Sequence, residues 1–140
     1  MGAFAAHYPD VLPEESDTEN DCVAYAVRGD TLVISGSNDR SVYYSVCHLL
    51  QTEFGVGFYW DRDVFEKKRS LSLPDGLTLQ ERSEFKMRHT IGQWVYNYGA
   101  FLNEAERREE LDKYARNKIN SYRLYLSLIH ISEPTRPLYI

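Results

Sequence analysis

The stretch from Thr31 to Trp60 reads TLVISGSNDRSVYYSVCHLLQTEFGVGFYW and contains three segments in succession. TLVIS is a short run of strand-forming residues, and GSND then breaks the strand and offers Asn38 or Asp39 as a helix cap. From Ser41 to Phe54 the apolar residues recur at helical spacing, and Gly55 is a stop signal. The letters FYW at the end favour a second strand. The stretch therefore predicts a strand, a helix and a strand.

The predicted helix has an apolar stripe that should face a sheet. Val42, Val46, Leu49 and Leu50 recur with the helical period, and we expect them to be buried. His48 lies beside this stripe, where a histidine is more often a hydrogen-bonded helix residue than a ligand.

On the N-terminal side, Val23 to Arg28 predicts a strand, and Gly29 with Asp30 predicts a tight hairpin into TLVIS. On the C-terminal side, a charged loop over Asp61 to Arg69 and an alternating strand over Ser70 to Leu73 complete the unit. We therefore expect a small α+β domain over residues 22–79, in which one helix packs on a small sheet.

A second pattern begins after Gln80 to Glu84, which is predicted to be a polar connector. Phe85 to His89 predicts a strand. Asn103 with Glu106 forms a capping-box-like start for a helix that runs to about Lys118.

Tyr122 to Tyr125 predicts another strand after this helix, so the second pattern is one βαβ unit, which requires a parallel sheet. A lone βαβ unit cannot bury both faces of its sheet. Residues 80–125 are therefore expected to be the first, truncated unit of a TIM-type (β/α)8 barrel.

Barrel enzymes carry their active groups at the carboxyl ends of the strands and in the loops that follow. Here the first strand ends at Arg88 and His89, and the next loop carries Trp94, Tyr96 and Asn97. A cation, an amide and aromatic faces suit a polyhydroxylated ligand, because they hydrogen-bond hydroxyls and stack on sugar rings. These five residues are our predicted substrate-binding site, with a carbohydrate as the partner.

An alternative assigns the same residues to an interface between the two domains. In that case Arg88 pairs with an acidic residue such as Glu84, and Trp94 belongs to the inter-domain core.

Composition and motifs exclude several classes of function. The 140 residues are 43% hydrophobic and 26% charged, which is a globular composition. A net charge of -5 argues against nucleic-acid binding, and no apolar run approaches the ~20 residues that span a membrane. No phosphate-loop, dinucleotide or zinc motif occurs, and Cys22 and Cys47 match no metal or redox spacing. We expect no cofactor and no metal, and we assign no catalytic residue.

The two ends of the chain are expected to lie outside the domains. Residues 1–21 show no sustained period and are predicted to be an arm. Leu126 to Arg136 reads LSLIHISEPTR, which resembles the in-frame translation of a sequencing adapter. We therefore interpret residues 126–140 as adapter-derived, with the natural sequence cut near Tyr125.

The central stretch resembles the small N-terminal domain of several large glycoside hydrolases. The pattern is a strand with I-x-G, a helix with G-x-Y-x-L-L and a G-x-x-W/Y turn, matched here by Ile34, Gly36, Tyr44, Leu49, Leu50, Gly55 and the segment 58–60. Ser45 stands where those proteins commonly carry Gly. The families are the α-glucuronidases of family 67, the α-N-acetylglucosaminidases of family 89 and the β-hexosaminidases of family 20.

The resemblance implies both a fold and a function. It implies a hexosaminidase-domain-2-like unit that supports a catalytic barrel, which is entered through a strand containing Arg, here Arg88. Glu110 to Asn120 is similar to a helix-to-strand pattern of family 89. The acid/base carboxylates of these families lie on later strands, so we expect this chain to be inactive by itself. The alternative is a non-catalytic carbohydrate-binding or surface-interaction domain.

Overall fold

The computed structural model describes residues 7–13, 20–65, 72–90 and 103–122. It confirms a mixed α+β architecture. Its main sheet has the strand order β2 (Thr31–Gly36), β1 (Cys22–Arg28) and β5 (Thr78–Arg82), and both pairings are antiparallel. β1 (Cys22–Arg28) and β2 (Thr31–Gly36) form the predicted hairpin. Gly29 in its turn has a φ of 57°, which is a conformation that glycine adopts readily.

The third strand, β5 (Thr78–Arg82), lies where the sequence predicts a polar connector and crosses the predicted boundary at residue 79. It pairs with β1 from Cys22 opposite Arg82 to Ala26 opposite Thr78. The connector prediction was wrong because an edge strand with solvent on one face needs few apolar residues. Within the described half of the predicted strand over 70–73, Ser72 and Leu73 are not in a strand.

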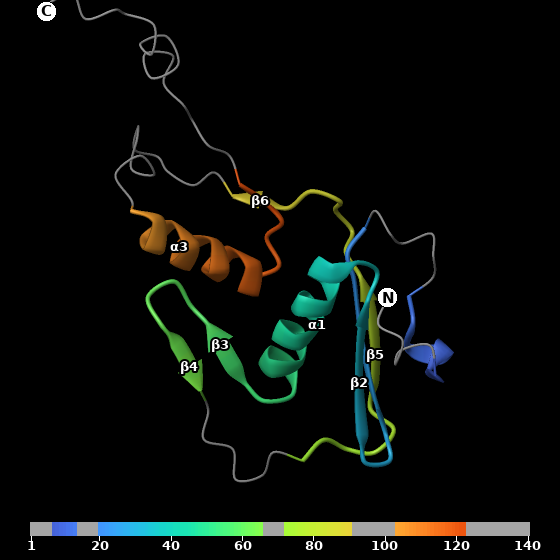
Figure 1. The fold of residues 1–140 in the computed structure, drawn as a ribbon. Helices are drawn as coiled ribbons and strands as arrows, with labels where there is room; N and C mark the ends of the chain where they lie inside the picture. Colours follow the sequence, from blue (N-terminus) through green and yellow to red (C-terminus); the bar gives the residue numbers. More distant parts are fainter. Residues whose placement is uncertain (1–6, 14–19, 66–71, 91–102, 123–140) are drawn as a thin grey trace, which may run out of the picture.

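Both faces of the main sheet are covered (Figure 1). α1 (Asp39–Thr52) lies on one face, and the short 3-10 helix η2 (Pro9–Val11) lies on the other. Val11 packs with Ala24, Ala26 and Val33 in a buried cluster. Part of the predicted N-terminal arm therefore contributes to the core, and the residues of β1 before Arg28 are all buried between the two layers.

α1 begins where the sequence predicts, but it buries a different face. Asn38 caps it, with its side-chain oxygen accepting a hydrogen bond from the Ser41 N–H at 2.9 Å. Leu49 is buried as predicted, whereas Val42 is 40% exposed and Val46 is 37% exposed. Leu50 is only partly buried. The expected apolar stripe was therefore wrong in three of its four members.

Small polar residues explain the difference. Ser45 is fully buried, and its hydroxyl accepts a hydrogen bond from the Ala24 N–H at 3.1 Å. The same hydroxyl lies 2.6 Å from the carbonyl oxygen of Ser35, to which it can donate. A Cβ on Gly36 would lie 2.6 Å from the Ser41 backbone, so the helix and sheet approach closely here. Serines with satisfied hydroxyls permit this approach, and larger aliphatic residues turn outward.

The next hairpin consists of β3 (Val56–Phe58) and β4 (Asp63–Phe65), which pair antiparallel. The strand predicted over 58–60 therefore ends at Phe58, and Tyr59 and Trp60 lie in the connecting turn, where both are exposed. The predicted charged loop contains β4. The pairing of β3 with β4 determines where these two strands begin and end, because the apolar run in this region is too short to predict their bounds.

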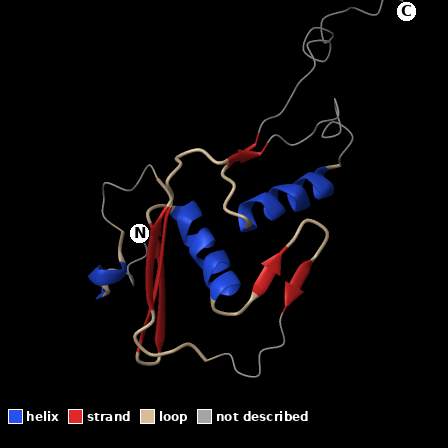
Figure 2. Cartoon of the chain, turned by 180° about the vertical axis from the view of Figure 1, so that it is seen from behind, coloured by secondary structure: helices blue, strands red, loops and turns tan. Residues whose placement is uncertain are grey.

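The C-terminal part contains a strand, a helix and a strand: β6 (His89–Thr90), α3 (Glu104–Arg116) and β7 (Ser121–Tyr122). β6 and β7 pair in parallel, so the predicted βαβ order is confirmed. α3 lies on the side of α1 that faces away from the main sheet (Figure 2). Both capping-box hydrogen bonds of α3 are present. β6 starts later than predicted, and Leu111 of α3 is 49% exposed.

Candidate functional site

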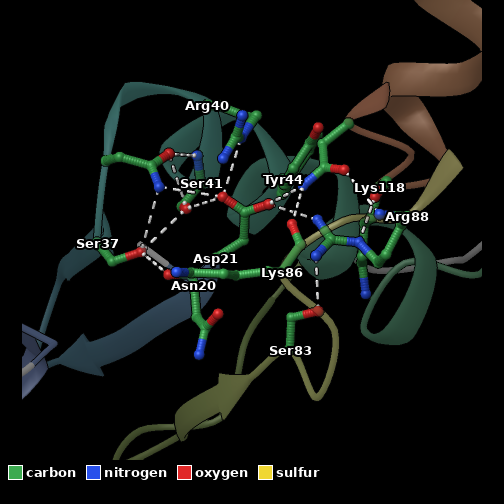
Figure 3. Close-up of polar contacts among 12 residues, drawn as sticks. Asn20, Asp21, Ser37, Arg40, Ser41, Tyr44, Ser83, Lys86, Arg88 and Lys118 are labelled. Carbon is green, nitrogen blue, oxygen red and sulfur yellow. Dashed lines mark hydrogen bonds and ion pairs between the residues drawn. The ribbon is translucent and has the colours of Figure 1, made fainter. Parts of the chain in front are cut away.

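A buried carboxylate, Asp21, lies immediately before β1 and collects hydrogen bonds from both parts of the chain (Figure 3). Its side chain is only 2% exposed. Five side chains donate to it: Asn38, Arg40 and Ser41 to Oδ1, and Arg88 and Asn120 to Oδ2. The first oxygen therefore binds the start of α1, and the second binds the residues that directly precede β6 and β7.

The donors keep Asp21 ionised. Burial alone raises the pKa of a carboxyl group, because the charged form loses its hydration. Hydrogen bonds from Asn38, Arg88 and Arg40 outweigh this effect and lower the pKa of Asp21 to about 2. The carboxylate is consequently a fixed negative charge at neutral pH, paired with two guanidinium groups at its two oxygens.

Arg88 connects Asp21 to the second unit. Its Nε donates to the Lys118 carbonyl oxygen at 2.6 Å, and one amino nitrogen donates to Ser83 at 2.6 Å and to the Phe85 carbonyl oxygen at 2.9 Å. The other amino nitrogen donates to Asp21. Four of the five N–H groups of the guanidinium are thus directed at protein, which leaves at most one for a ligand.

Asn120 completes the joint between the units. Its side-chain oxygen accepts a hydrogen bond from the Arg88 N–H at 2.8 Å. Its amide nitrogen donates to Asp21 at 3.0 Å and to the Lys86 carbonyl oxygen at 2.8 Å. The Arg88 guanidinium also lies over the ring of Tyr44 on α1, with 5.7 Å between its central carbon and the ring centroid. We call Asp21, Arg88 and Asn120 the joint.

A cavity of about 380 Å³ opens beside the joint. Its lining combines carboxylates, cations and aromatic rings. The lining residues come from the start of β1, from α1, from β5 and the loop after it, and from the end of α3: Asp21, Val23, Tyr44, Glu81, Arg82, Ser83, Glu84, Phe85, Arg88, Asn117 and Lys118. Such a mixed lining suits a small polar ligand with several hydrogen-bonding groups.

The predicted site residues have different outcomes. Arg88 lines this cavity. To donate two hydrogen bonds to neighbouring hydroxyl groups of a sugar, its guanidinium would have to give up at least one of its hydrogen bonds to the protein. His89 is exposed on β6. Trp94, Tyr96 and Asn97 lie outside the described residues, as does the segment 126–140. The binding role of these five residues stays a prediction.

The alternative interpretation paired Arg88 with an acidic residue such as Glu84. The structure shows Arg88 in an ion pair with an acidic residue, and this residue is Asp21. Asp21 was not singled out from the sequence, and Asn120 was noted only as the last residue of the family-89-like pattern. An aspartate just before a strand and an asparagine shortly after a helix are both common, so no local pattern indicates that the two side chains meet. Only their meeting across 99 positions reveals the joint.

No protein-family model matches the chain, and none of the curated proteins matches it either. Within the described residues no helix is both long and apolar enough to cross a membrane. In the same part of the chain, no three His, Cys, Asp or Glu side chains gather as potential metal ligands.

Proposed function

We propose that the chain is the N-terminal part of a glycoside hydrolase, in which a small α+β domain supports the start of a catalytic (β/α)8 barrel. The observation that carries this proposal is the joint. A buried carboxylate binds the N-terminal end of α1 through one oxygen and both Arg88 and Asn120 through the other.

The arrangement supports a scaffolding role for the small domain. β6 and β7 form a parallel pair connected through α3, which is the repeating element of such a barrel. Among the described residues no further strand pairs with β6 or β7, and the strands of a complete barrel would cover these edges. A rigid joint would hold this first unit in register while the rest of the barrel assembles on it.

Reading the source DNA beyond the adapter-like segment is the direct test. The proposal expects at least about 200 further residues in strand–helix alternation, and hydrolysis of an aryl glycoside by the completed protein. The 140-residue chain alone should show no turnover. A stop codon or a linker directly after residue 125 would contradict the proposal.

Arg88→Lys in the completed enzyme tests the substrate role of Arg88. A loss of about tenfold in kcat/KM, or about 1.4 kcal/mol of transition-state binding, measured at a temperature where the variant is still fully folded, supports a substrate contact. A lowered melting temperature with unchanged kinetics shows that Arg88 serves the joint only.

A non-catalytic carbohydrate-binding domain is the second candidate. It is favoured by Tyr59 and Trp60, which are 59% and 60% exposed in the β3–β4 turn. Trp60 has Tyr114 at 5.5 Å between ring centroids and Lys113 at 5.6 Å, so its ring is positioned by α3. Oligosaccharide binding by the 140-residue chain that is lost in Trp60→Ala would support this candidate.

A further inference from the structure

Lys118 has an unusual backbone at the end of α3. Its φ is 60°, and it is the one non-glycine residue with a positive φ among those that the structure describes. This left-handed conformation is unfavourable for a residue with a side chain, and helices commonly place Gly there. The Ile119 N–H closes the end of the helix by donating to the Tyr114 carbonyl oxygen at 3.0 Å.

The side chain of Lys118 reaches α1. Its Nζ is hydrogen-bonded to Nδ1 of His48, which is 9% exposed. On the other side of the ring, Nε2 of His48 lies 3.6 Å from a carboxylate oxygen of Glu81 on β5. With the proton on Nε2, the imidazole accepts at Nδ1 from the amine and directs its N–H toward Glu81. Three elements thus form an amine–imidazole–carboxylate relay.

The charges around the relay act in both directions. Burial lowers the pKa of Lys118, Glu81 and Cys47 oppose that change, and Arg88 reinforces it. Burial also lowers the pKa of His48, and Lys118 adds to this, while Glu81 and Glu53 oppose it. The result favours a neutral imidazole and increases the share of neutral amine at Lys118 relative to an ordinary lysine.

The relay borders the cavity beside the joint, since Lys118 and Glu81 both line it. We propose that Lys118 is a reactive amine that condenses in this cavity with the aldehyde of a small hydroxyaldehyde. The inference is independent of the proposed glycoside hydrolase, because it rests on the relay and the cavity alone.

The chemistry balances without another reactant. His48 accepts a proton from the ammonium group at Nδ1, and the lone pair of the amine attacks the aldehyde carbon. A C–N bond forms while the carbonyl π pair moves to oxygen, and this oxygen takes a proton from the attacking nitrogen to give a carbinolamine. The nitrogen lone pair then expels the hydroxyl group as water with the proton that His48 returns, and the products are a protonated imine, one water molecule and neutral His48.

Glyceraldehyde with cyanoborohydride, followed by digestion and mass spectrometry, tests the proposal on the whole 140-residue chain at pH 7. The reductant traps each imine as a stable secondary amine. Lys86, which is exposed in the loop after β5, is the internal control. We expect Lys118 to be labelled several times faster than Lys86. Equal or slower labelling of Lys118 would overturn the proposal.

Two variants test the relay itself. His48→Gln should slow labelling of Lys118 and leave Lys86 unchanged. If thermal melting shows that this variant does not fold, Glu81→Gln serves instead, since the Glu81 side chain is 61% exposed. A folded variant that labels Lys118 at the wild-type rate contradicts the role of the relay.

Discussion

Every side chain that is hydrogen-bonded to the Asp21 carboxylate is a donor, and this determines what a substitution at position 21 would do. Asn38, Arg40 and Ser41 donate to one oxygen, and an amide at position 21 would present an NH2 group to donors on at least one side. The neighbours of Asp21 therefore require a group with two acceptor oxygens and no N–H donor at this position.

Asp21→Asn is expected to lower the free energy of unfolding by roughly 3 kcal/mol, at the low end of the cost of breaking a buried ion pair. The low end applies because its partners Arg88 and Arg40 remain partly hydrated, with 21% and 46% of their side chains exposed. Urea unfolding measures the change. Glu84→Gln is the control and should change the value by less than about 0.5 kcal/mol; an equal loss in both variants would contradict the joint.

The same residue should make stability depend on acidity. The pKa of Asp21 is about 2 in the folded protein, below its ordinary value of 3.8. Because the pKa of Asp21 is lower in the folded protein than in the unfolded chain, its ionised form stabilises the fold at any pH above the pKa of the unfolded chain. This contribution is lost as the pH falls from about 4 toward 2. At 1.36 kcal/mol per unit, the loss amounts to about 2 kcal/mol.

Urea unfolding between pH 5 and pH 2 checks this expectation. Asp10 and Glu109 also have lowered pKa values, through Arg28 and Lys113 respectively, so part of the acid loss is theirs. The difference between the wild type and Asp21→Asn isolates the part that belongs to Asp21. If that difference is constant over this range, the low pKa of Asp21 is wrong.

At the scale of the element, α1 turns toward the sheet with its serines. Ser41 and Ser45 are fully buried, and the neighbouring valines face outward. The helix keeps one large aliphatic anchor, Leu49, which is 4% exposed.

Leu49→Ala is therefore expected to lower the free energy of unfolding by about 2–5 kcal/mol, the usual cost of a cavity in a core. Val46→Ala, on the exposed side of the same helix, is the matched control and should cost less than about 1 kcal/mol. Thermal and urea unfolding of both variants check the assignment of the buried face. The reverse order of losses would support the apolar stripe that the sequence predicts.

At the scale of the whole molecule, a small number of polar contacts joins the two units. Asn120 contacts Asp21, the Arg88 backbone and the Lys86 carbonyl oxygen together. The α3 side of the molecule also contacts the β3–β4 hairpin through an ion pair between Arg116 and Asp63 at 2.5 Å.

Asn120→Ala is expected to speed amide hydrogen exchange in α3 more than in β1, because removing the joint lets the βαβ unit open by itself. Asn20→Ala is the matched control, since its side chain points away from the Asp21 carboxylate (Figure 3). Exchange that rises equally in both elements would mean that the units unfold together.

Local patterns in the sequence were enough to predict the β1–β2 hairpin, the position of α1, the capping box of α3 and the order of the βαβ unit. Each depends on residues close together in the chain, such as Gly29 in its turn or Asn103 three residues before Glu106. Propensity, capping and periodicity act over that range.

Long-range contacts decided the rest. β5 is a strand because β1 lies beside it, and α1 buries Ser45 because the Ala24 N–H and the Ser35 carbonyl oxygen meet its hydroxyl. The site depends on them still more, since Asp21 and Asn120 are joined across 99 positions and His48 and Lys118 across 70. Hydrogen bonds to a buried charge are specified in three dimensions, and no spacing along the chain encodes them.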